Sequence, residues 1–464
     1  MNLTKNTIIE GEIIGYASDG MGLCRANGQV VFVERGVRGD RCRLRIVKAL
    51  KNKAYARIEE LLEPSPHRRT PACPVFPRCG GCDFWHMSYE EELYYKRQRV
   101  ADALERLGGS PFPQLEITGG QREGYRNKAI YPCAMGEEGP AAGFYRRRSH
   151  QVVPGERCAI QSPQADALRR AVLDWASCWQ IPIYDEQAGR GLLRRIYVRT
   201  GQGGALLTLV VAGRGVPQPE DLIRRCHQAC SDLAGILLNE NRDEGNRVLG
   251  PQCLPLWGQE QLQDSLCGVE FSLSPLSFYQ VNRRQAEALY RQAAEYAGGG
   301  PEETLLDLYC GAGTIGLTMA RRFGRLIGVE IVPQAVEDAR QNARRNGITN
   351  ARFLCADAGQ AARQLLQEGL RPQTVTVDPP RKGLDEAARQ AVLALAPQRL
   401  VYISCDPATM ARDIKELSQG GYRLTQARAF DLFPCTANVE TVVLLSKLHA
   451  NHTVEGAGLS NPAL

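Results

Sequence analysis

The residue with the clearest capacity for chemistry is Cys405, which follows the apolar stretch 400–404 and precedes Asp406 and Pro407. An aspartate that can cap a helix, followed by proline at the first helical position, predicts that a helix begins here. A thiol at a helix N-terminus has a lowered pKa and is suited to act as a nucleophile. We therefore predict that Cys405 is a catalytic nucleophile.

A cysteine nucleophile in this setting suits attack on a uracil ring. Uracil C5 is too electron-poor to take a methyl group unaided, but a thiolate that adds to C6 turns C5 into an enolate carbon. A base must then remove the C5 proton before the thiolate can leave. Glu440, a carboxylate at the start of the apolar stretch 441–445, is the predicted base. On the residues alone, a surface acid is an equally open interpretation of Glu440.

The elements that must position these two residues alternate between strands and helices from about residue 277 to residue 448, as in a parallel α/β sheet. A buried strand is predicted over 304–310, and it leads into the pattern G-x-G-x-x-G that starts with Gly311 and Gly313 and opens a helix. These glycines supply a tight turn and a close approach of the backbone to a ligand. Alone they do not distinguish a dinucleotide site from a site for S-adenosylmethionine.

Carboxylates end the next three strands of this predicted sheet, at Glu330, Asp357 and Asp378. Glu330 is placed to accept hydrogen bonds from ribose hydroxyls, and Asp357 is expected at the depth of an adenine ring. The acid on the third strand and the Asp-Pro-Pro that begins at Asp378 favour a methyltransferase over a dehydrogenase. Because Arg381 follows the prolines where an aromatic residue would be expected, methylation of an exocyclic base amine is disfavoured.

Four cysteines have the spacing of metal ligands: Cys73, Cys79 and Cys82 in a Gly- and Pro-rich loop, and Cys158 further along the chain. A disulfide framework is not expected for the 16 cysteines, because cytosolic conditions keep thiols reduced. Four thiolates suit Zn²⁺ or an iron–sulfur cluster, and the spacing alone does not choose between them. The other cysteines, apart from Cys405, lack ligand spacing.

The length of 464 residues and the local composition predict a multidomain α/β protein. We expect a small β-barrel over 1–62, a central α+β domain with the cysteine cluster over 63–275, a Rossmann-like domain over 276–448 and a disordered tail over 449–464. No stretch reaches the roughly 18 apolar residues of a membrane span, and the N-terminus is not a secretory signal, so a cytoplasmic location is expected. The net charge of +6 permits a nucleic-acid partner.

Two regions predict contacts with RNA. Basic residues on mostly alternating positions would give one face of the barrel a positive stripe, although a charge-protected edge strand is the alternative: Arg41, Arg43, Arg45, Lys48, Lys51 and Lys53. In the central domain, residues 124–128 and 143–150 interleave aromatic side chains with Arg and Lys. Such mixtures stack on splayed bases and pair with phosphates. A solvated basic face is the alternative there.

Together these motifs resemble the RNA uracil-5-methyltransferase family, and specifically its branch that acts on 23S ribosomal RNA with an N-terminal TRAM barrel, which is OB-like, and a 4Fe-4S cluster. The resemblance covers nearly all of residues 1–448. It rests on the four spaced cysteines and on five further stretches: 277–282, 307–316, 378–383, 404–407 and 433–440.

The resemblance implies roles for individual residues. Cys405 is the nucleophile and Glu440 the base, and contacts to S-adenosylmethionine come from Gln280, Tyr309, Glu330 and Asp378. The spaced cysteines would hold the cluster, and the partner would be 23S ribosomal RNA, with no DNA or membrane partner. The chain departs from the family pattern at Asn438, where histidine is frequent, and at Asp406, where asparagine is frequent.

Two other functions are compatible with the sequence. The first is the same chemistry on transfer RNA. The predicted barrel and cluster favour ribosomal RNA over this alternative. The second is a noncatalytic RNA-binding or ribosome-assembly factor that keeps the fold without turnover. The intact Cys405, Glu440 and glycine loop argue against this second function.

Overall fold

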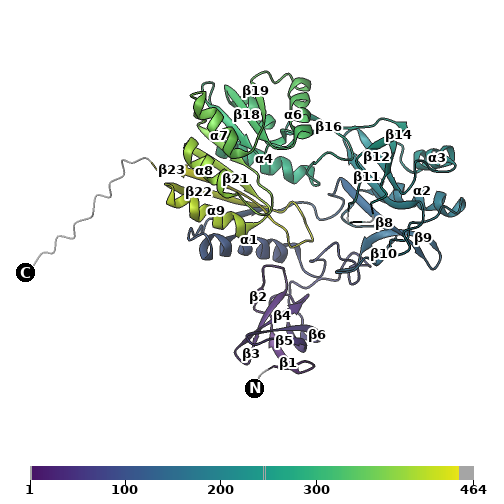
Figure 1. Ribbon diagram of the computed structural model, residues 1–464. Helices are drawn as coiled ribbons and strands as arrows, with labels where there is room; N and C mark the ends of the chain where they lie inside the picture. The colour runs from purple at the N-terminus through teal and green to yellow at the C-terminus, as the bar shows by residue number, and fades with distance from the viewer. Residues whose placement is uncertain (1–2, 244, 246, 449–464) are drawn as a thin grey trace, which may run out of the picture.

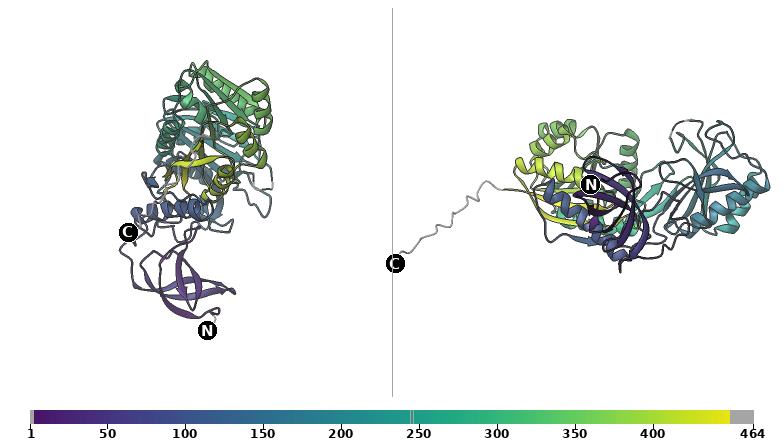
Figure 2. Two further views of the ribbon diagram at one scale, coloured as in Figure 1. Left: turned by 90° about the vertical axis from the view of Figure 1, so that its left-hand side faces the viewer. Right: turned by 90° about the horizontal axis from the view of Figure 1, so that it is seen from below.

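The computed structural model describes residues 3–243, 245 and 247–448. Figure 1 shows three bodies built around three sheets, with the N-terminal sheet at the bottom and apart from the other two. The two further views agree on this separation (Figure 2). The tail 449–464, for which disorder was predicted, lies outside the described residues. No helix in the described part of the chain is long and apolar enough to cross a membrane.

The N-terminal sheet has six strands in the order β1-β5-β6-β4-β3-β2, which is consistent with the predicted barrel. Alternate residues of these strands are buried, so one face forms a small core of its own. Asn27 and Gly28, which both have positive φ, 48° and 75°, form a tight turn between two paired strands. The strands are β1 Ile8–Glu12, β2 Gly15–Tyr16, β3 Gly22–Ala26, β4 Gln29–Glu34, β5 Arg41–Ala49 and β6 Lys53–Glu63.

Half of the predicted positive stripe on this sheet is neutralised. Each arginine of β5 forms an ion pair with a glutamate of the adjacent strand β6: Arg41 with Glu63, Arg43 with Glu60 and Arg45 with Glu59. These pairs are exposed and add little stability, but they cancel the charge that would attract phosphates. The uncompensated charge of the stripe therefore lies at its far end, on the lysines.

The central sheet has seven strands in the order β10-β9-β8-β11-β12-β13-β14. Helices α2 and α3 pack against it, and its middle strands are buried throughout. A two-stranded hairpin, β15–β16, leads to the next domain. The elements are β8 Lys128–Gly136, β9 Gly139–Tyr145, β10 Val152–Pro154, α2 Pro163–Cys178, β11 Leu193–Gly201, β12 Gly204–Val211, α3 Pro219–Ala229, β13 Leu233–Glu240, β14 Cys253–Gly258, β15 Leu262–Leu266 and β16 Val269–Leu273.

The C-terminal sheet has eight strands in the order β19-β18-β17-β20-β21-β23-β22-β7. The five predicted parallel strands are confirmed, and the strand order reverses between β17 and β20, where ligands bind in sheets of this kind. The elements are α4 Arg283–Ala297, β17 Thr304–Leu308, α5 Thr314–Met319, η1 Ala320–Arg322, β18 Arg325–Glu330, α6 Pro333–Arg345, β19 Ala351–Cys355, α7 Ala358–Gln367, β20 Thr374–Val377, α8 Glu386–Leu395, β21 Arg399–Ser404, α9 Pro407–Gln419, β22 Tyr422–Phe430 and β23 Glu440–Lys447.

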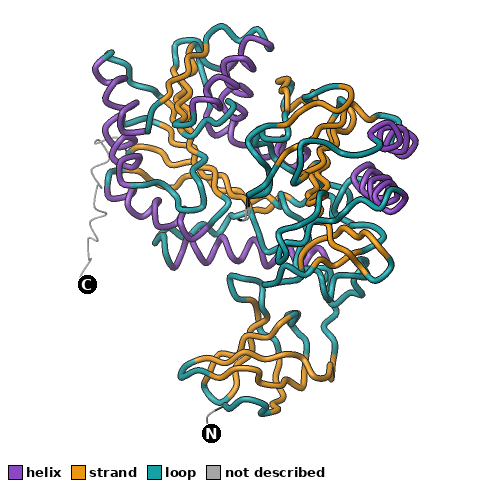
Figure 3. Tube along the Cα trace, turned by 45° about the vertical axis from the view of Figure 1, so that its right-hand side comes forward, coloured by secondary structure: helices purple, strands orange, loops and turns teal. Residues whose placement is uncertain are grey.

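Two elements that precede the central sheet in the chain pack on the C-terminal sheet. Helix α1 (Tyr89–Arg106) packs on it, and strand β7 (Glu116–Thr118) adds to the sheet edge in parallel with β22. Figures 1 and 3 show α1 running between the N-terminal sheet and the C-terminal body. Leu104 of α1 is fully buried in the core beneath this sheet. Thus α1 and β7, which lie before residue 275 in the chain, pack with the C-terminal sheet.

Replacing Leu104 with alanine should lower the free energy of unfolding of the C-terminal body by about 2–5 kcal/mol, because the substitution leaves a cavity in that core. Leu107, which ends the same helix and is 50% exposed, is the matched control. Its alanine variant should change stability by less than about 0.5 kcal/mol. Denaturant unfolding of the full chain measures both, and equal effects would contradict the packing of α1 described above.

Candidate active site

A cavity of about 840 Å³ opens at the carboxyl ends of β17, β18, β20 and β21. Most of the residues predicted for the site line it together: Gln280, Tyr309, Gly311, Glu330, Asp378, Cys405 and Glu440. These residues come from six separate stretches of chain, and the sheet topology brings them to one edge. The cavity is therefore the candidate active site.

The glycine loop and the end of β18 hold each other in place at one side of the cavity. The Gly311 N–H donates to Glu330 Oε2 at 3.1 Å, and the Val332 N–H donates to Oε1 of the same carboxylate at 2.9 Å. The loop turns sharply here, since Tyr309 and Gly311 have φ of 62° and 54°. The carboxylate of Glu330 is thus fixed at the cavity wall.

Two residues predicted to contact the cofactor do not line the cavity. Gly313 begins α5 with φ of 81°, and a Cβ there would lie 2.9 Å from Leu317, so the glycine permits close packing beneath the loop. Asp357 caps α7, because its carboxylate accepts a hydrogen bond from the Gln360 N–H at 2.8 Å. Local folding gives each of these residues a structural role, and their contact with a cofactor stays a prediction.

The two predicted catalytic residues are brought together by strand pairing. In the antiparallel pair β21–β23, Ser404 lies opposite Thr441, so the next positions along the chain, Cys405 and Glu440, face each other at the end of the pair. Both side chains line the cavity, and Glu440 is only 6% exposed. Asp378, at the end of the neighbouring strand β20, joins them.

The predicted lowering of the Cys405 pKa is wrong. Burial, together with the neighbouring carboxylates of Glu440 and Asp378, raises the pKa of the thiol to about 11. The helix N-terminus offers little compensation, because Asp406 Oδ1 already accepts the N–H groups of Ala408 and Thr409, each at 3.0 Å. In the free protein at neutral pH, Cys405 is therefore a protonated thiol.

The carboxyl groups around the thiol also hold protons more firmly than usual. Burial, together with the charge of Asp307, raises the pKa of Asp378 to about 7. Burial, together with Asp378, raises the pKa of Glu440 well above its ordinary value, although Arg381 acts in the opposite direction. A carboxylate with a raised pKa is a stronger base once it is ionised, so ionised Glu440 is suited to accept a proton.

Several lining residues were not predicted for this site. Lys128, the first residue of β8, reaches the cavity from the central sheet, and burial together with Arg199 and Arg126 lowers its pKa to about 8. Phe433 and Asn438 line the cavity from the loop between β22 and β23. The basic and aromatic composition around Lys128 did indicate RNA contact. No local signal in the sequence could show that two domains share one cavity.

The four spaced cysteines lie around a second cavity of about 240 Å³. All four are free and partly exposed, and an apolar cluster that includes Phe76 and Trp85 borders them. Cys435, from the loop between β22 and β23, lies in the same cluster, which its spacing did not indicate. Within the described residues, no group of three or more His, Cys, Asp or Glu side chains has the geometry to hold a metal ion. The predicted metal cluster is therefore not confirmed.

Comparison with known proteins identifies the family. A family model described as tRNA (uracil-5-)-methyltransferase matches residues 260–448. An uncharacterized RNA methyltransferase of Halalkalibacterium halodurans is 39% identical over 447 residues, covering 96% of this chain and 98% of that protein. A second, from Clostridium tetani, is 37% identical over 445 residues, covering 95% and 97%. The chain belongs to the RNA uracil-5-methyltransferase family.

A solved structure resembles the whole chain. The tRNA (uracil-54, C5)-methyltransferase of Pyrococcus abyssi, in complex with S-adenosyl-L-homocysteine, is 26% identical, with a TM-score of 0.76. The similarity covers 94% of this chain and 100% of that one. The predicted family is thus confirmed, and family membership supports S-adenosylmethionine as the methyl donor.

Because the pKa of Cys405 is raised, we expect its thiol to be alkylated slowly at neutral pH. Alkylation of Cys405 by iodoacetamide should be slow at about pH 8 and should accelerate as the pH approaches about 11. Asp378→Asn removes a negative charge that raises the thiol pKa, so its profile should shift to lower pH. Asp357→Asn, whose side chain lies outside the cavity, should leave the profile unchanged. Peptide-resolved mass spectrometry measures the rates, and full reactivity of wild-type Cys405 at pH 7 would contradict this account.

Proposed function

We propose that this protein methylates C5 of a uridine in RNA, with Cys405 as the nucleophile and Glu440 as the base. The observation that carries the proposal is the placement of these two residues opposite each other at the end of β21 and β23, in a cavity shared with the glycine loop. A noncatalytic RNA-binding factor would have no need for this arrangement. The cytoplasmic location expected from the sequence is part of the proposal.

The methyl donor would bind at the side of the cavity formed by the glycine loop. Tyr309 and Gly311 form its turn, Glu330 offers a fixed carboxylate for ribose hydroxyls, and Gln280 and Asp378 complete the wall. S-adenosylmethionine, when bound, supplies an electrophilic methyl group. The other side of the cavity, toward Cys405, Glu440 and Lys128, is left for the uridine.

The residues of the chain account for the remaining steps. The Cys405 thiol gives its proton to a water molecule, and its sulfur forms a bond to uracil C6, so the electron pair of the C5–C6 double bond moves onto C5 and the O4 carbonyl. C5 then carries both its hydrogen and the new methyl group. Glu440 takes the C5 proton, the double bond re-forms, and the C6–sulfur bond breaks to return the thiolate.

For the substrate we propose 23S ribosomal RNA, on the family resemblance of the motifs. Transfer RNA is the second candidate, favoured by the similarity of the whole chain to the Pyrococcus abyssi enzyme. Because that similarity covers 94% of this chain, the N-terminal sheet does not favour ribosomal RNA as the sequence suggested. We further propose that RNA contacts the exposed lysines of this sheet and residues 124–128 and 143–150 of the central domain.

The catalytic proposal is tested by separating the steps that the two residues serve. Cys405→Ala should form no covalent RNA adduct, because C6 addition requires the thiolate. Glu440→Gln should allow addition and methyl transfer but should retain the C5 proton, so methylated RNA stays bonded to Cys405. A denaturing gel with labelled donor and transcripts of 23S ribosomal or transfer RNA shows the adduct and its substrate. Normal turnover by Glu440→Gln would refute the base assignment, and absence of methylation on any cellular RNA would favour the noncatalytic factor.

We also propose that Cys73, Cys79, Cys82 and Cys158 hold a 4Fe-4S cluster. The proposal rests on the chemistry of the four cysteines, which line one cavity with an apolar border. Protein purified without oxygen should contain about four irons per chain. Cys82→Ser should lose the iron, whereas Cys178→Ser, at an exposed helix end, should retain it. Stoichiometric zinc without iron would refute the cluster.

A further inference from the structure

The loop between β22 and β23, residues 431–439, determines where the proposed base lies. It ends at Glu440, and on the way it supplies Phe433 and Asn438 to the wall of the active-site cavity. The loop is mostly buried but has no regular secondary structure. Its backbone polar groups therefore need partners from elsewhere in the chain.

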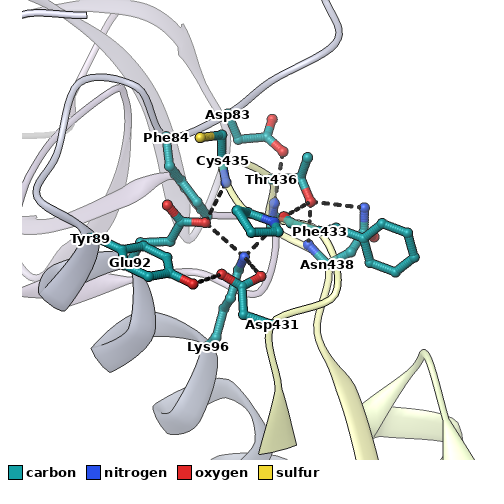
Figure 4. A network of polar contacts seen from close by, with 12 residues as sticks. Asp83, Phe84, Tyr89, Glu92, Lys96, Asp431, Phe433, Cys435, Thr436 and Asn438 are labelled. Carbon is teal, nitrogen blue, oxygen red and sulfur yellow. Dashed lines mark hydrogen bonds and ion pairs between the residues drawn. The ribbon is translucent and has the colours of Figure 1, made fainter. Parts of the chain in front are cut away.

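A buried lysine on α1 binds this loop (Figure 4). The side chain of Lys96 is fully buried, and its Nζ donates to Asp431 Oδ1 at 2.5 Å, to Glu92 Oε1 at 2.7 Å and to the Phe433 carbonyl at 3.1 Å. Tyr89, two turns earlier on α1, donates from its hydroxyl to the other oxygen of Asp431 at 2.8 Å. The start of the loop is thus held by charged and polar groups of one helix.

The segment that carries Cys73, Cys79 and Cys82, here called the cysteine-bearing segment, binds the middle of the same loop. The Asp83 N–H donates to the Cys435 carbonyl at 2.7 Å, and Asp83 Oδ2 accepts from the Ala437 N–H at 2.8 Å (Figure 4). The Cys435 N–H donates to Glu92 Oε1 at 2.6 Å, which joins this contact to the lysine network. Asp83 follows Cys82 directly, so the segment that carries the proposed ligands is bonded to the loop that carries the proposed base.

The energetics indicate that this network fixes the position of the loop 431–439 more than it stabilises the fold. Burial alone would lower the pKa of Lys96, but Glu92 and Asp431 raise it above the ordinary value, so the lysine stays charged. Removing such charges from water costs several kcal/mol per ion, and apolar residues of similar volume often stabilise a core equally well or better. What apolar residues cannot provide is three directed hydrogen bonds that fix the path of a loop.

We propose that Lys96 and Asp83 are positioning residues that hold the loop 431–439 so that Glu440 can reach the C5 proton. The inference rests on the proposed function of Glu440. It assigns the cysteine-bearing segment a part in proton removal, through hydrogen bonds to the loop. Loosening the network should therefore slow proton removal more than methyl transfer.

The test uses a charge-neutral double variant, Lys96→Met with Asp431→Asn, which removes one positive and one negative charge from the network. RNA labelled with tritium at uridine C5 reports proton removal, and label from the methyl donor reports methyl transfer, both in a single turnover. In the variant, tritium release should lag behind methyl incorporation by about 10- to 100-fold, since small displacements of a catalytic group have effects of this size. Val100→Ala, buried on the same helix without a polar contact to the loop, is the control and should show no lag.

A second pair of variants covers the case in which the buried double variant does not fold. Asp83 is partly exposed, and Asp83→Ala removes the acceptor for the Ala437 N–H, whereas Asp83→Asn retains an oxygen there. Asp83→Ala should show the lag, and Asp83→Asn should restore most of the wild-type ratio. A role in general stability would not produce this difference.

Hydrogen exchange of the free protein provides a readout that does not depend on catalysis. Amides of residues 435 and 437 should exchange faster in Asp83→Ala than in wild type or Asp83→Asn. Equal exchange, or equal loss of tritium release and methyl incorporation, would overturn the positioning role. If Glu440→Gln itself shows no lag, the proposed base is wrong, and this outcome is distinct from a network variant that fails while Glu440→Gln behaves as expected.

Discussion

The antiparallel pairing of β21 with β23 is the constraint on which the candidate site depends. The end of β21 meets the beginning of β23, so two residues that lie 35 positions apart in the chain, Cys405 and Glu440, face each other. Side chains alternate between the faces of a strand, and a slip of one residue would turn Glu440 away from Cys405. The register is set by the buried apolar residues of β23, which belong to the cores on both faces of the sheet. The packing of the sheet thereby fixes the geometry of the site.

The same burial that positions these groups sets their protonation. The Cys405 thiol, Asp378 and Glu440 share a desolvated region in which negative charge is unfavourable, so the pKa of each is raised. Any ionisation of one makes the ionisation of the others harder. A site of this kind favours a reaction in which negative charge moves onto the substrate and is not accumulated on the protein. Addition of the thiolate to an electron-poor ring is such a reaction.

The sequence predicted the parallel strands and the residues at their ends well, because both follow from local patterns. Buried apolar stretches followed by a polar residue identify Glu330 and Asp378 without knowledge of the fold. The sequence could not predict features that arise from contacts between distant segments. Burial by distant segments, together with the carboxylates of Glu440 and Asp378, raises the pKa of Cys405, and the capping role of Asp357 depends on the fold of α7. The entry of Lys128 into the cavity depends on how two domains pack.

The position of α1 and β7 has a consequence for the order in which the chain folds during synthesis. Both elements leave the ribosome early, yet β7 pairs with β22, and α1 packs on α9 and β22, about 300 residues later. Until the C-terminus is made, the buried face of α1, with Val100 and Leu104, has no partner in the sheet. The central sheet can form in this interval, because its strands are complete before residue 258. The C-terminal body is therefore the last to fold. Until then the apolar face of α1 is open to binding by chaperones and to aggregation.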